Sequence, residues 1–381
     1  MPAYEPPHSG AAQENAMRII RQIASPTGLL DYRPEHDAVA VEGGGGLTYG
    51  AYFAGLEAFL TGEAGAALFE AAREAGCGPR DDGITELAIR AEKHGALYHP
   101  ASVTARFAGG EAKLCVNVAA TPAAVALLEQ EAGWLAGLRQ TFTPDYLPRP
   151  RAFGLVGETA YLLEDWYAGH HEFHQDGSGR VRLWDFDAGE RLLSTAQSLE
   201  LYRQAACILT RYYHAASGSS IGPWHHAAGD FVARVDGDAV SVRLITVRGY
   251  GAGQDFSEAG ALAEKLAALA FFTNLTMRLR LDRVDGVGEL VVAGDDVAAA
   301  AVQGFAQGLA ALGLDAATAQ GILEFLGSFS PEELSRAALG LAWPCPEDEA
   351  ALVAASWPGH ATVVVDALAR LGETGSKDTP S

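Results

Sequence analysis

The sequence predicts an α+β protein with two lobes and an extra helical segment at the N-terminus. Three observations support this. Residues 16–80 carry apolar positions at helical spacing, residues 84–168 alternate like short strands around one long helix, and the chain is largely helical from about residue 195. We therefore expect a helical segment at 1–80, a small β-rich lobe at 84–168, a mainly helical lobe at 169–372 and a disordered tail at 373–381.

The N-terminal segment contains three predicted helices. The stretches ENAMRIIRQIA (14–24), GLTYGAYFAGLEAFLTG (46–62) and EAGAALFEAAREAGCG (63–78) have helical periodicity, and glycines end the last one. Four consecutive glycines at 43–46 suggest a phosphate loop, but neither a Lys-Ser/Thr pair nor GxGxxG spacing accompanies them. A flexible connector is the better interpretation.

The β-rich lobe is predicted from strand-like alternation broken by glycine pairs. Three strands are expected in 84–92, 102–110 and 112–120, and an amphipathic helix follows in 121–140, with Thr121 as its N-cap. Two more strands are expected in 148–169 around a Gly-Glu turn. This order predicts a small antiparallel sheet with one covering helix.

The helical lobe is predicted to begin with a long amphipathic helix at 196–217. The next clear element is a hairpin, because FVARV (231–235) and VSVRLITV (240–247) flank the turn sequence Asp-Gly-Asp. Several further apolar helices follow, the last near 359–372. No internal repeat interrupts this pattern.

Composition limits the class of partner. The net charge is −21 and the pI is about 4.8, so we expect neither nucleic acid nor an anionic membrane surface as a partner. The four cysteines stand far apart without a CxxC pair, which is typical of free thiols in a reducing compartment. No signal-peptide pattern and no long apolar run occurs, so a cytoplasmic protein is expected. The richness in Ala and Gly suits a bacterial gene.

The order of elements over residues 84–310, together with local matches, resembles the protein-kinase-like fold, most closely its aminoglycoside and choline phosphotransferase branch. The stretch AAGDF is similar to the His-Gly-Asp step of that family. The resemblance makes Asp230 the candidate catalytic base. Ala228 replaces the family's histidine, but His225 and His226 lie close by and are candidate catalytic residues.

The same resemblance implies that several ligand positions are altered. Asn117 in KLCVNVA falls where the family has a phosphate-binding lysine, and Glu131 is the candidate for the glutamate that pairs with that lysine. No asparagine follows Asp230, and Thr246 in LITV stands at the position of a magnesium-binding aspartate. Magnesium prefers hard carboxylate oxygens, so ATP with Mg²⁺ is left open as a cofactor whose metal ligands are lost.

Three further groups are candidate binding residues. Lys93 and Arg248 could supply positive charge to an anionic ligand, although Lys93 in AEKHGALYHP also fits a solvated turn. His171, Glu172 and His174 are candidate substrate contacts or plain surface. Their order, HHEFH, is not HExxH, so no metal site is assigned.

Three hypotheses remain open from the sequence. The first is a degenerate, pseudokinase-like protein that binds a small molecule or a protein partner in the cleft between the two lobes. The second is an active small-molecule phosphotransferase with Asp230 as base. The third is a non-kinase enzyme that uses the histidine clusters at 170–174 and 225–230. The oligomeric state is not predicted.

Overall fold

The protein is of the α+β class and consists of two compact units. The computed structural model describes residues 17–25, 28–78, 83–92, 95, 97–185, 189–224 and 227–375. The first unit comprises Met1–Glu129 with Pro150–Trp166, and the second comprises Gln130–Arg149 with Tyr167–Ser381. Each unit is described separately.

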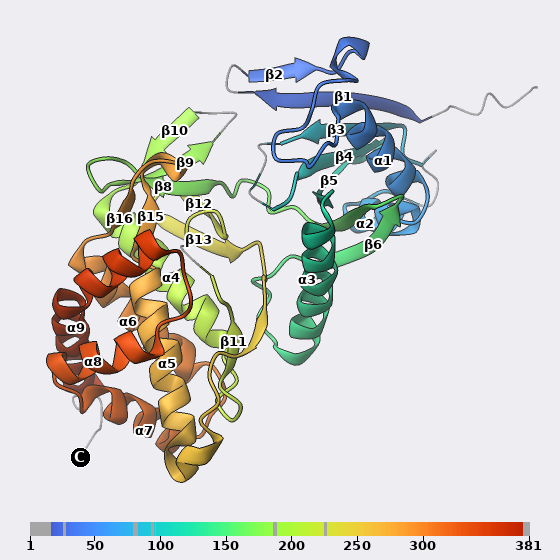
Figure 1. The fold of residues 1–381 in the computed structure, drawn as a ribbon. Coiled ribbons are helices and arrows are strands. Elements are labelled where there is room, and N and C mark those ends of the chain that lie inside the picture. The colour runs from blue at the N-terminus through green and yellow to red at the C-terminus, as the bar shows by residue number, and fades with distance from the viewer. Residues whose placement is uncertain are drawn as a thin grey trace, which may run out of the picture. The chain divides into compact units, whose positions relative to one another are not determined.

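The first unit is built on a seven-stranded mixed sheet (Figure 1). The strand order is β2-β1-β3-β4-β5-β7-β6, with β1 parallel to β3 and every other neighbouring pair antiparallel. The strands are β1 (Arg18–Ser25), β2 (Gly28–Asp31), β3 (Glu86–Ala91), β4 (Ala101–Phe107), β5 (Gly110–Ala119), β6 (Pro150–Val156) and β7 (Thr159–Asp165). The edge strand β6 has a register shift between Pro150 and Ala152, and the other edge strand, β2, has four residues.

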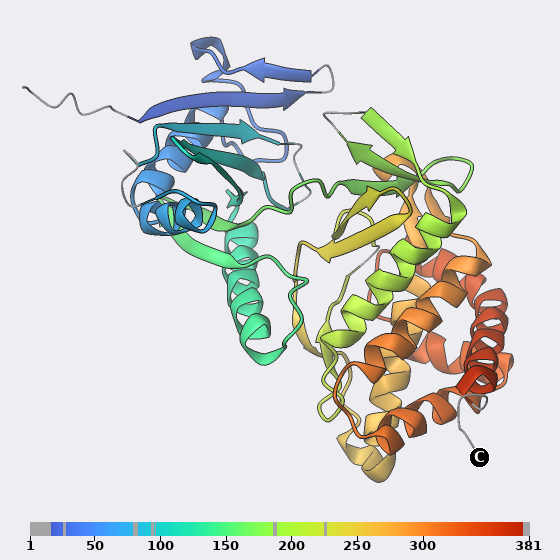
Figure 2. The same cartoon turned by 180° about the vertical axis from the view of Figure 1, so that it is seen from behind.

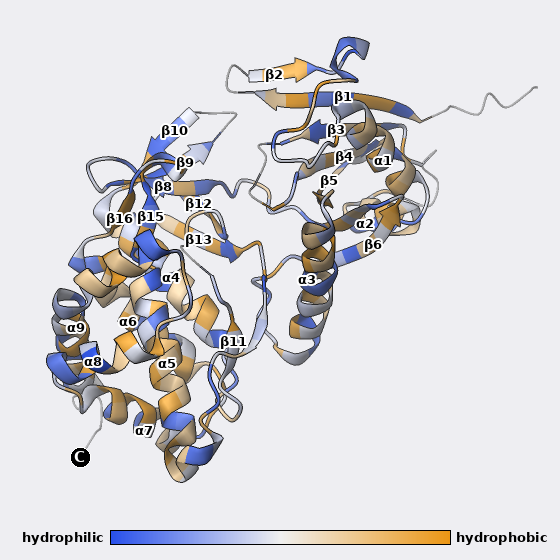
Figure 3. Ribbon diagram, viewed as in Figure 1, coloured by the Kyte–Doolittle hydropathy of each residue, from blue (hydrophilic) through white to orange (hydrophobic). Residues whose placement is uncertain are grey.

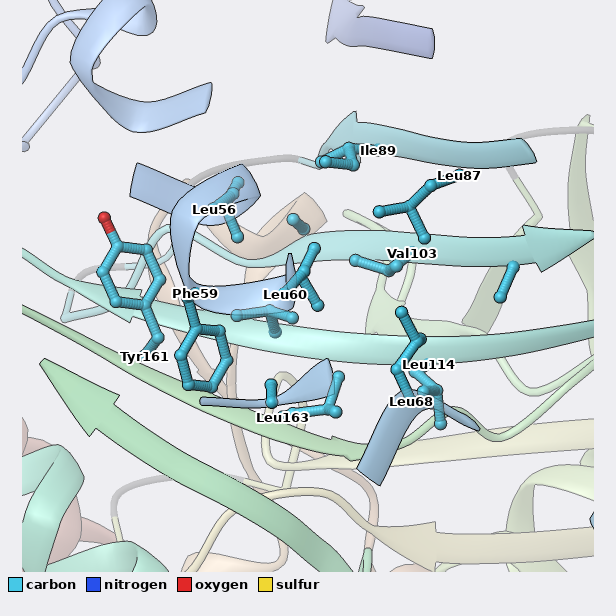
Figure 4. Packing of buried hydrophobic residues seen from close by; sticks show 14 of the residues in the cluster. Leu56, Phe59, Leu60, Leu68, Leu87, Ile89, Val103, Leu114, Tyr161 and Leu163 are labelled. Atoms are coloured by element: carbon cyan, nitrogen blue, oxygen red, sulfur yellow. The ribbon is translucent and has the colours of Figure 1, made fainter. Parts of the chain in front are cut away.

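Alternation along these strands creates one buried face. Every second residue of β3 and β5 is buried, and helices α1 (Tyr49–Thr61) and α2 (Gly65–Glu74) supply the apolar side chains that cover this face. Figure 4 shows Leu56, Phe59 and Leu60 of α1 and Leu68 of α2 among the apolar side chains of the sheet, and the ring of Phe59 stacks on that of Tyr161 in β7. Thr48 caps α1 by accepting a hydrogen bond from the Ala51 amide. A short 3-10 helix (Pro34–His36) precedes α1.

The prediction of a helix at 14–24 is wrong, because residues 18–25 form β1. The stretch RIIRQIAS places its isoleucines at spacings that satisfy a helix, but its backbone pairs with β3 from Arg18 to Ile23. Residues 1–80 are therefore not a separate helical segment, since β1 and β2 belong to the same sheet as β3–β7. The helices predicted at 46–62 and 63–78 are confirmed as α1 and α2.

The second unit is mainly helical and carries four small sheets (Figures 1 and 2). Part of α3 (Pro122–Thr141) belongs to it. Its other helices are α4 (Thr195–Arg211), α5 (Ala263–Arg278), α6 (Asp295–Ala310), α7 (Ala316–Gly327), α8 (Pro331–Leu341) and α9 (Glu347–Gly375), with 3-10 turns at Ser257–Leu262 and Val284–Gly286. The sheets pair β8 (Glu172–Gln175), β9 (Val181–Asp185) and β10 (Gly189–Leu192); β11 (Ser219–Ile221) and β14 (Tyr250–Ala252); β12 (Phe231–Asp236) and β13 (Ala239–Leu244); and β15 (Leu281–Arg283) and β16 (Leu290–Val292).

The core of the second unit is formed by α4, α5, α6 and α9. Figure 3 shows apolar residues along most of α5, in agreement with an unbroken run of buried side chains from Ala268 to Arg278. The hairpin predicted around Asp-Gly-Asp is confirmed as β12–β13. The sheet β8–β10 lies in a region that was expected to be mainly helical, and α9 extends to Gly375, so residues 373–375 are helical rather than disordered tail.

Helix α9 is the one helix of the described residues that is long and apolar enough to cross a membrane by length and composition alone. One of its faces is buried and carries Trp357, His360 and Val364. The Nδ1 atom of His360 accepts a hydrogen bond from Arg280, which lies just after the end of α5. A single helix of this kind is weak evidence for a membrane span, because core helices pass the same length and composition test.

Candidate functional site around Asp230

Asp230 lies in a tight turn that leads directly into β12. Gly229 precedes it with a φ of 84°, a left-handed conformation that glycine adopts without steric cost. The Asp230 amide donates to the carbonyl of Ala227 at 3.3 Å, and its carbonyl accepts from the Ile245 amide at 2.9 Å. Because Ile245 follows β13, this second bond ties the turn to the end of the hairpin. These two bonds hold the backbone of Asp230 on both its amide and its carbonyl side.

The Asp230 carboxylate forms an ion pair with Arg248. The Arg248 guanidinium donates from Nη2 to Asp230 Oδ1 at 2.8 Å. The side chain of Asp230 is 8% exposed and that of Arg248 is 36% exposed, so the carboxylate is buried beneath a cation that reaches solvent. A carboxylate held in this way is stabilised in its charged form. Two residues chosen separately from the sequence, one as a base and one as an anion ligand, thus neutralise each other.

Asp230 and Arg248 line a small cavity in the second unit. Its volume is about 10 Å³, which is room for about one water molecule. The indole Nε1 of Trp224, another lining residue, has no hydrogen-bond partner within the described part of the chain, and Trp224 is 4% exposed. The lining residues are Leu209, Ile221, Gly222, Pro223, Trp224, Asp230, Phe231, Leu244, Thr246 and Arg248.

Glu131 of α3 is held by the segment that follows β13. Its Oε1 accepts a hydrogen bond from the Thr246 hydroxyl and another from the Val247 amide, each at 2.6 Å. Glu131 is 2% exposed, and its Oε2 has no partner among the described residues. Glu131 was expected to pair with the residue at the phosphate-binding position. Thr246 was expected at the position where the phosphotransferases have a magnesium-binding aspartate. They are instead bonded to each other.

Asn117 belongs to the first unit and also has a partner there. It lies on the face of β5 opposite to the buried face, and its Nδ2 donates to Glu164 Oε1 at 2.9 Å. On the same face, the Lys113 ammonium lies 4.3 Å from the centre of the Trp166 ring. Asn117 therefore uses its amide within the sheet. Lys93 lies outside the described residues, as do His225 and His226.

The histidines of the 170–174 cluster are separated by the geometry of β8. His171 exchanges backbone hydrogen bonds with Ala233, and its Nε2 is 3.4 Å from Asp185 Oδ2. Glu172 opens β8 and is half-buried. His174 is buried, and its Nδ1 lies 3.1 Å from Asp282 Oδ1.

The side chain of His174 has a structural role. Asp282 also accepts from the Gln175 amide at 2.7 Å, so the carboxylate connects β8 to β15. His174 as a whole is 6% exposed and its ring pairs with Asp282, so the predicted contact of His174 with substrate stays a prediction that this geometry does not support. Neither His171, Glu172 nor His174 lines the cavity beside Asp230. Within the described ranges no group of three or more His, Cys, Asp or Glu side chains is placed to hold a metal ion.

The arrangement has limited chemical capacity for phosphoryl transfer. That reaction needs cations on the phosphates and oxygen ligands for magnesium. The carboxylate of Asp230 is bonded to Arg248, and Glu131 is bonded to Thr246 and Val247. Both pairings remove a group that the resemblance to phosphotransferases would use. The position of Trp224 in the wall of the small cavity was not predicted. The one local feature that pointed to Trp224 is that it precedes the histidine pair in WHHAAGD.

Comparisons with known proteins add no family to this picture: no family model matches the chain, and no curated protein matches it. The function is therefore argued from the geometry of the site.

Proposed function

We propose that this protein is a degenerate relative of the kinase-like phosphotransferases that binds a small molecule or a protein partner and does not transfer phosphate. The observation that carries the proposal is the pairing of Glu131 with Thr246 and the Val247 amide, both at 2.6 Å. In an active relative a glutamate on this helix orients a phosphate-binding lysine, and an aspartate at the position of Thr246 binds magnesium. In this protein the residues at these two positions, Glu131 and Thr246, are bonded to each other in one buried contact.

The ion pair of Asp230 and Arg248 supports the same proposal. A general base must be free to accept a proton from the attacking hydroxyl group. Protonation of Asp230 would weaken the charge-assisted bond of 2.8 Å that it accepts from Arg248. The two-lobed, kinase-like arrangement and the ligand itself are parts of this proposal.

A thermal-shift titration with ATP and ADP, each with and without Mg²⁺, combined with phosphate release, tests the proposal. A ligand that binds only the folded state raises the melting temperature by mass action. We expect no magnesium-dependent shift, and we expect neither wild type nor Asp230→Asn to release phosphate above the level of buffer. A shift that is the same with and without Mg²⁺ identifies a nucleotide as the ligand. Turnover that requires Mg²⁺ and is lost in Asp230→Asn would refute the proposal.

The second candidate is an active small-molecule phosphotransferase with Asp230 as base. The specific observation in its favour is that Asp230 lines a cavity beside the unpaired indole N–H of Trp224. This candidate predicts that Arg248→Ala, which releases the carboxylate, raises any basal turnover. A non-kinase enzyme based on the histidine clusters has no comparable support, because His174 is committed to Asp282 and His225 and His226 lie outside the described residues.

A further inference from the structure

Three arginines of the second unit have no carboxylate partner. Arg211 ends α4, Arg234 lies on β12 and Arg243 lies on β13. None of them forms an ion pair with a carboxylate in the part of the chain that the structure describes, whereas Arg203 of α4 pairs with Glu200. Unpaired cations are unexpected in a chain whose 48 acidic residues outnumber its 27 lysines and arginines. We call these three residues the arginine cluster.

Two members of the arginine cluster share one face of the β12–β13 hairpin. Arg234 is directly opposite Ser241, and Arg243 is two residues after Ser241 on the same strand, so all three side chains lie on that face. The turn that contains His170 lies against it. The Nε2 atom of His170 is 3.3 Å from Ser241 Oγ, and a Cβ added at Gly169 would lie 3.3 Å from Arg234 Cδ. Both cations are therefore held near His170.

Two tyrosine rings order the centre of the cluster. The Cζ atoms of Arg211 and Arg243 lie 5.5 Å and 5.6 Å from the centre of the Tyr146 ring, and Arg243 also lies 5.7 Å from the centre of the Tyr167 ring. A guanidinium over a ring can still direct the N–H groups of its edge at an oxyanion. Because these contacts restrict Arg243 before a ligand binds, less conformational freedom is lost on binding.

The donors that an anion needs are accessible. Arg243 donates from Nη1 to the Val242 carbonyl at 3.0 Å, and Arg211 donates from Nη1 to the Tyr146 hydroxyl at 3.2 Å. The Nε and Nη2 atoms of both residues have no hydrogen-bond partner among the described residues, and none of these atoms is shielded from solvent. Both side chains are half-buried, and Arg234 is exposed. The cluster thus presents free N–H donors at the surface.

We propose that the arginine cluster binds a phosphate monoester, with Arg243 as its central ligand. A guanidinium can form two parallel N–H···O bonds with a phosphate, and a dianion neutralises more of the positive charge of the cluster than a monoanion does. The net charge of −21 repels long polyanions such as nucleic acid, so a compact ester fits the cluster better. The site does not depend on the proposed function, because it uses none of Asp230, Arg248, Glu131 and Thr246.

The ring of His170 reports on the charge of the cluster. Burial lowers the pKa of His170 below its ordinary value, and the cations Arg243 and Arg234 lower it further, with a smaller effect of His171 in the same direction. An anion bound to the cluster cancels this field and raises the pKa of His170. An arginine that served only to pack against tyrosine would not produce this change.

Titration with phenyl phosphate, followed by NMR of the His170 ring, tests the proposal. We expect saturation, and a rise of about 1 in the pKa of His170. Methyl phenyl phosphate, a monoanionic diester, is the matched probe at equal ionic strength and should bind at least about threefold more weakly at pH 7.5, where the monoester is a dianion. Equal affinity for the diester, or saturation without a change in the pKa of His170, would overturn the proposal.

Variants of the arginines locate the site. Arg243→Gln should weaken phenyl phosphate at least about tenfold. Arg211→Gln and Arg234→Gln should each weaken it about threefold, and they keep the test valid if Arg243→Gln unfolds. Arg336→Gln removes the same charge from an exposed position of α8 and should leave the affinity unchanged. Wild-type affinity in folded Arg243→Gln or in both other cluster variants, or an equal loss in Arg336→Gln, contradicts the assignment.

A second probe distinguishes the two sources of such an ester. A capped glycine–phosphotyrosine–glycine peptide that binds more tightly than phenyl phosphate, and loses this affinity in Arg243→Gln, would assign the cluster to a phosphorylated side chain of a partner protein. Equal affinities of peptide and phenyl phosphate would assign it to a small phosphorylated molecule. Binding of the peptide that is the same before and after removal of its phosphate would overturn the proposal.

Discussion

The hydroxyl of Thr246 donates to Glu131 Oε1 at 2.6 Å, although the two residues are 115 positions apart in the chain. The same oxygen accepts from the Val247 amide, so one buried carboxylate fastens α3 to the segment that leaves β13. Since Glu131 is 2% exposed, the contact is shielded from water, and any second negative charge placed beside it is poorly screened.

The first prediction concerns a carboxylate at position 246. Thr246→Asp would introduce the residue that the phosphotransferases the sequence resembles use as a metal ligand, but it would place a second carboxylate against Glu131. We expect it to lower the free energy of unfolding by at least about 1 kcal/mol more than Thr246→Asn, which has the same shape without the charge. Urea denaturation at neutral pH measures the difference. Equal stability of the two variants would mean that Glu131 and residue 246 are not in contact.

The second prediction compares two adjacent acidic residues of α9. Glu349 and Arg278 form a buried ion pair at 2.7 Å with both side chains less than 5% exposed, whereas Asp348 and Arg283 form an exposed pair at 3.5 Å. Glu349→Ala leaves a buried guanidinium without its charge partner, so we expect a loss of about 3–5 kcal/mol. Asp348→Ala should cost less than about 1 kcal/mol.

Chemical denaturation of both variants provides the measurement. The double variant Arg278→Met with Glu349→Leu should regain most of the stability lost in Glu349→Ala, because it removes both charges together. A double variant as unstable as the single one would show that the loss comes from packing rather than from an uncompensated charge.

The third prediction is a loss of stability at mildly acidic pH that depends on His360. Burial, and then the nearby Arg280 cation, lower the pKa of His360 from its ordinary value of 6.5 to about 3. Between these values the unfolded chain binds a proton that the folded protein does not. Stability is therefore complete above pH 6.5 and falls as the pH decreases toward 3, by about 1.4 kcal/mol per pH unit.

Denaturation curves at pH 7 and pH 5 measure this effect, and at pH 5 the expected loss is about 2 kcal/mol. Arg280 has no acceptor atom, so Nδ1 of His360 must accept the hydrogen bond of 3.0 Å between them. A glutamine at position 360 offers its side-chain oxygen as the acceptor in place of Nδ1. His360→Gln should remove the loss. Burial also lowers the pKa of His170, and a loss that persists in His360→Gln would assign the effect to such other groups.

The fourth prediction tests the close approach of α4 and α6. An added Cβ at Gly304 of α6 would overlap the carbonyl oxygen of Arg203 and lie 2.7 Å from the Cβ of Ala206 on α4. Gly304→Ala should destabilise the protein by about 2 kcal/mol. Gly321 in α7 has open space at the same position, so Gly321→Ala should instead stabilise by about 0.5–1 kcal/mol. Thermal melts of the two variants compare them directly.

The elements predicted correctly are those whose determinants are local. Thr121 was predicted to cap α3, and it accepts from the Ala124 amide. The Asp-Gly-Asp turn needs a left-handed Gly237, and the sequence supplies it between two alternating segments. Strand β1 was missed because its conformation depends on β3, more than sixty residues later in the chain, and no local feature of RIIRQIAS reports that pairing.

The candidate site could be predicted only as a set of residues. Asp230 was selected from the sequence as a base and Arg248 as an anion ligand, and Glu131 and Thr246 were selected at the positions of a lysine-pairing glutamate and a metal-binding aspartate. The structure pairs Asp230 with Arg248, which is 18 positions later in the chain, and Glu131 with Thr246, which is 115 positions later. No spacing rule predicts either pairing. The contact of His174 with Asp282 was missed for the same reason, since the two residues are 108 positions apart.

The two edges of the seven-stranded sheet determine how the first unit can meet other chains. At one edge, Pro150 lacks an amide hydrogen and the register shift beside it breaks the row of free backbone groups. At the other, β2 offers four residues, of which Leu29 and Leu30 are exposed. A foreign strand could extend this sheet at β2 only over a very short length, which disfavours uncontrolled polymerisation through backbone pairing even though two leucines are exposed there.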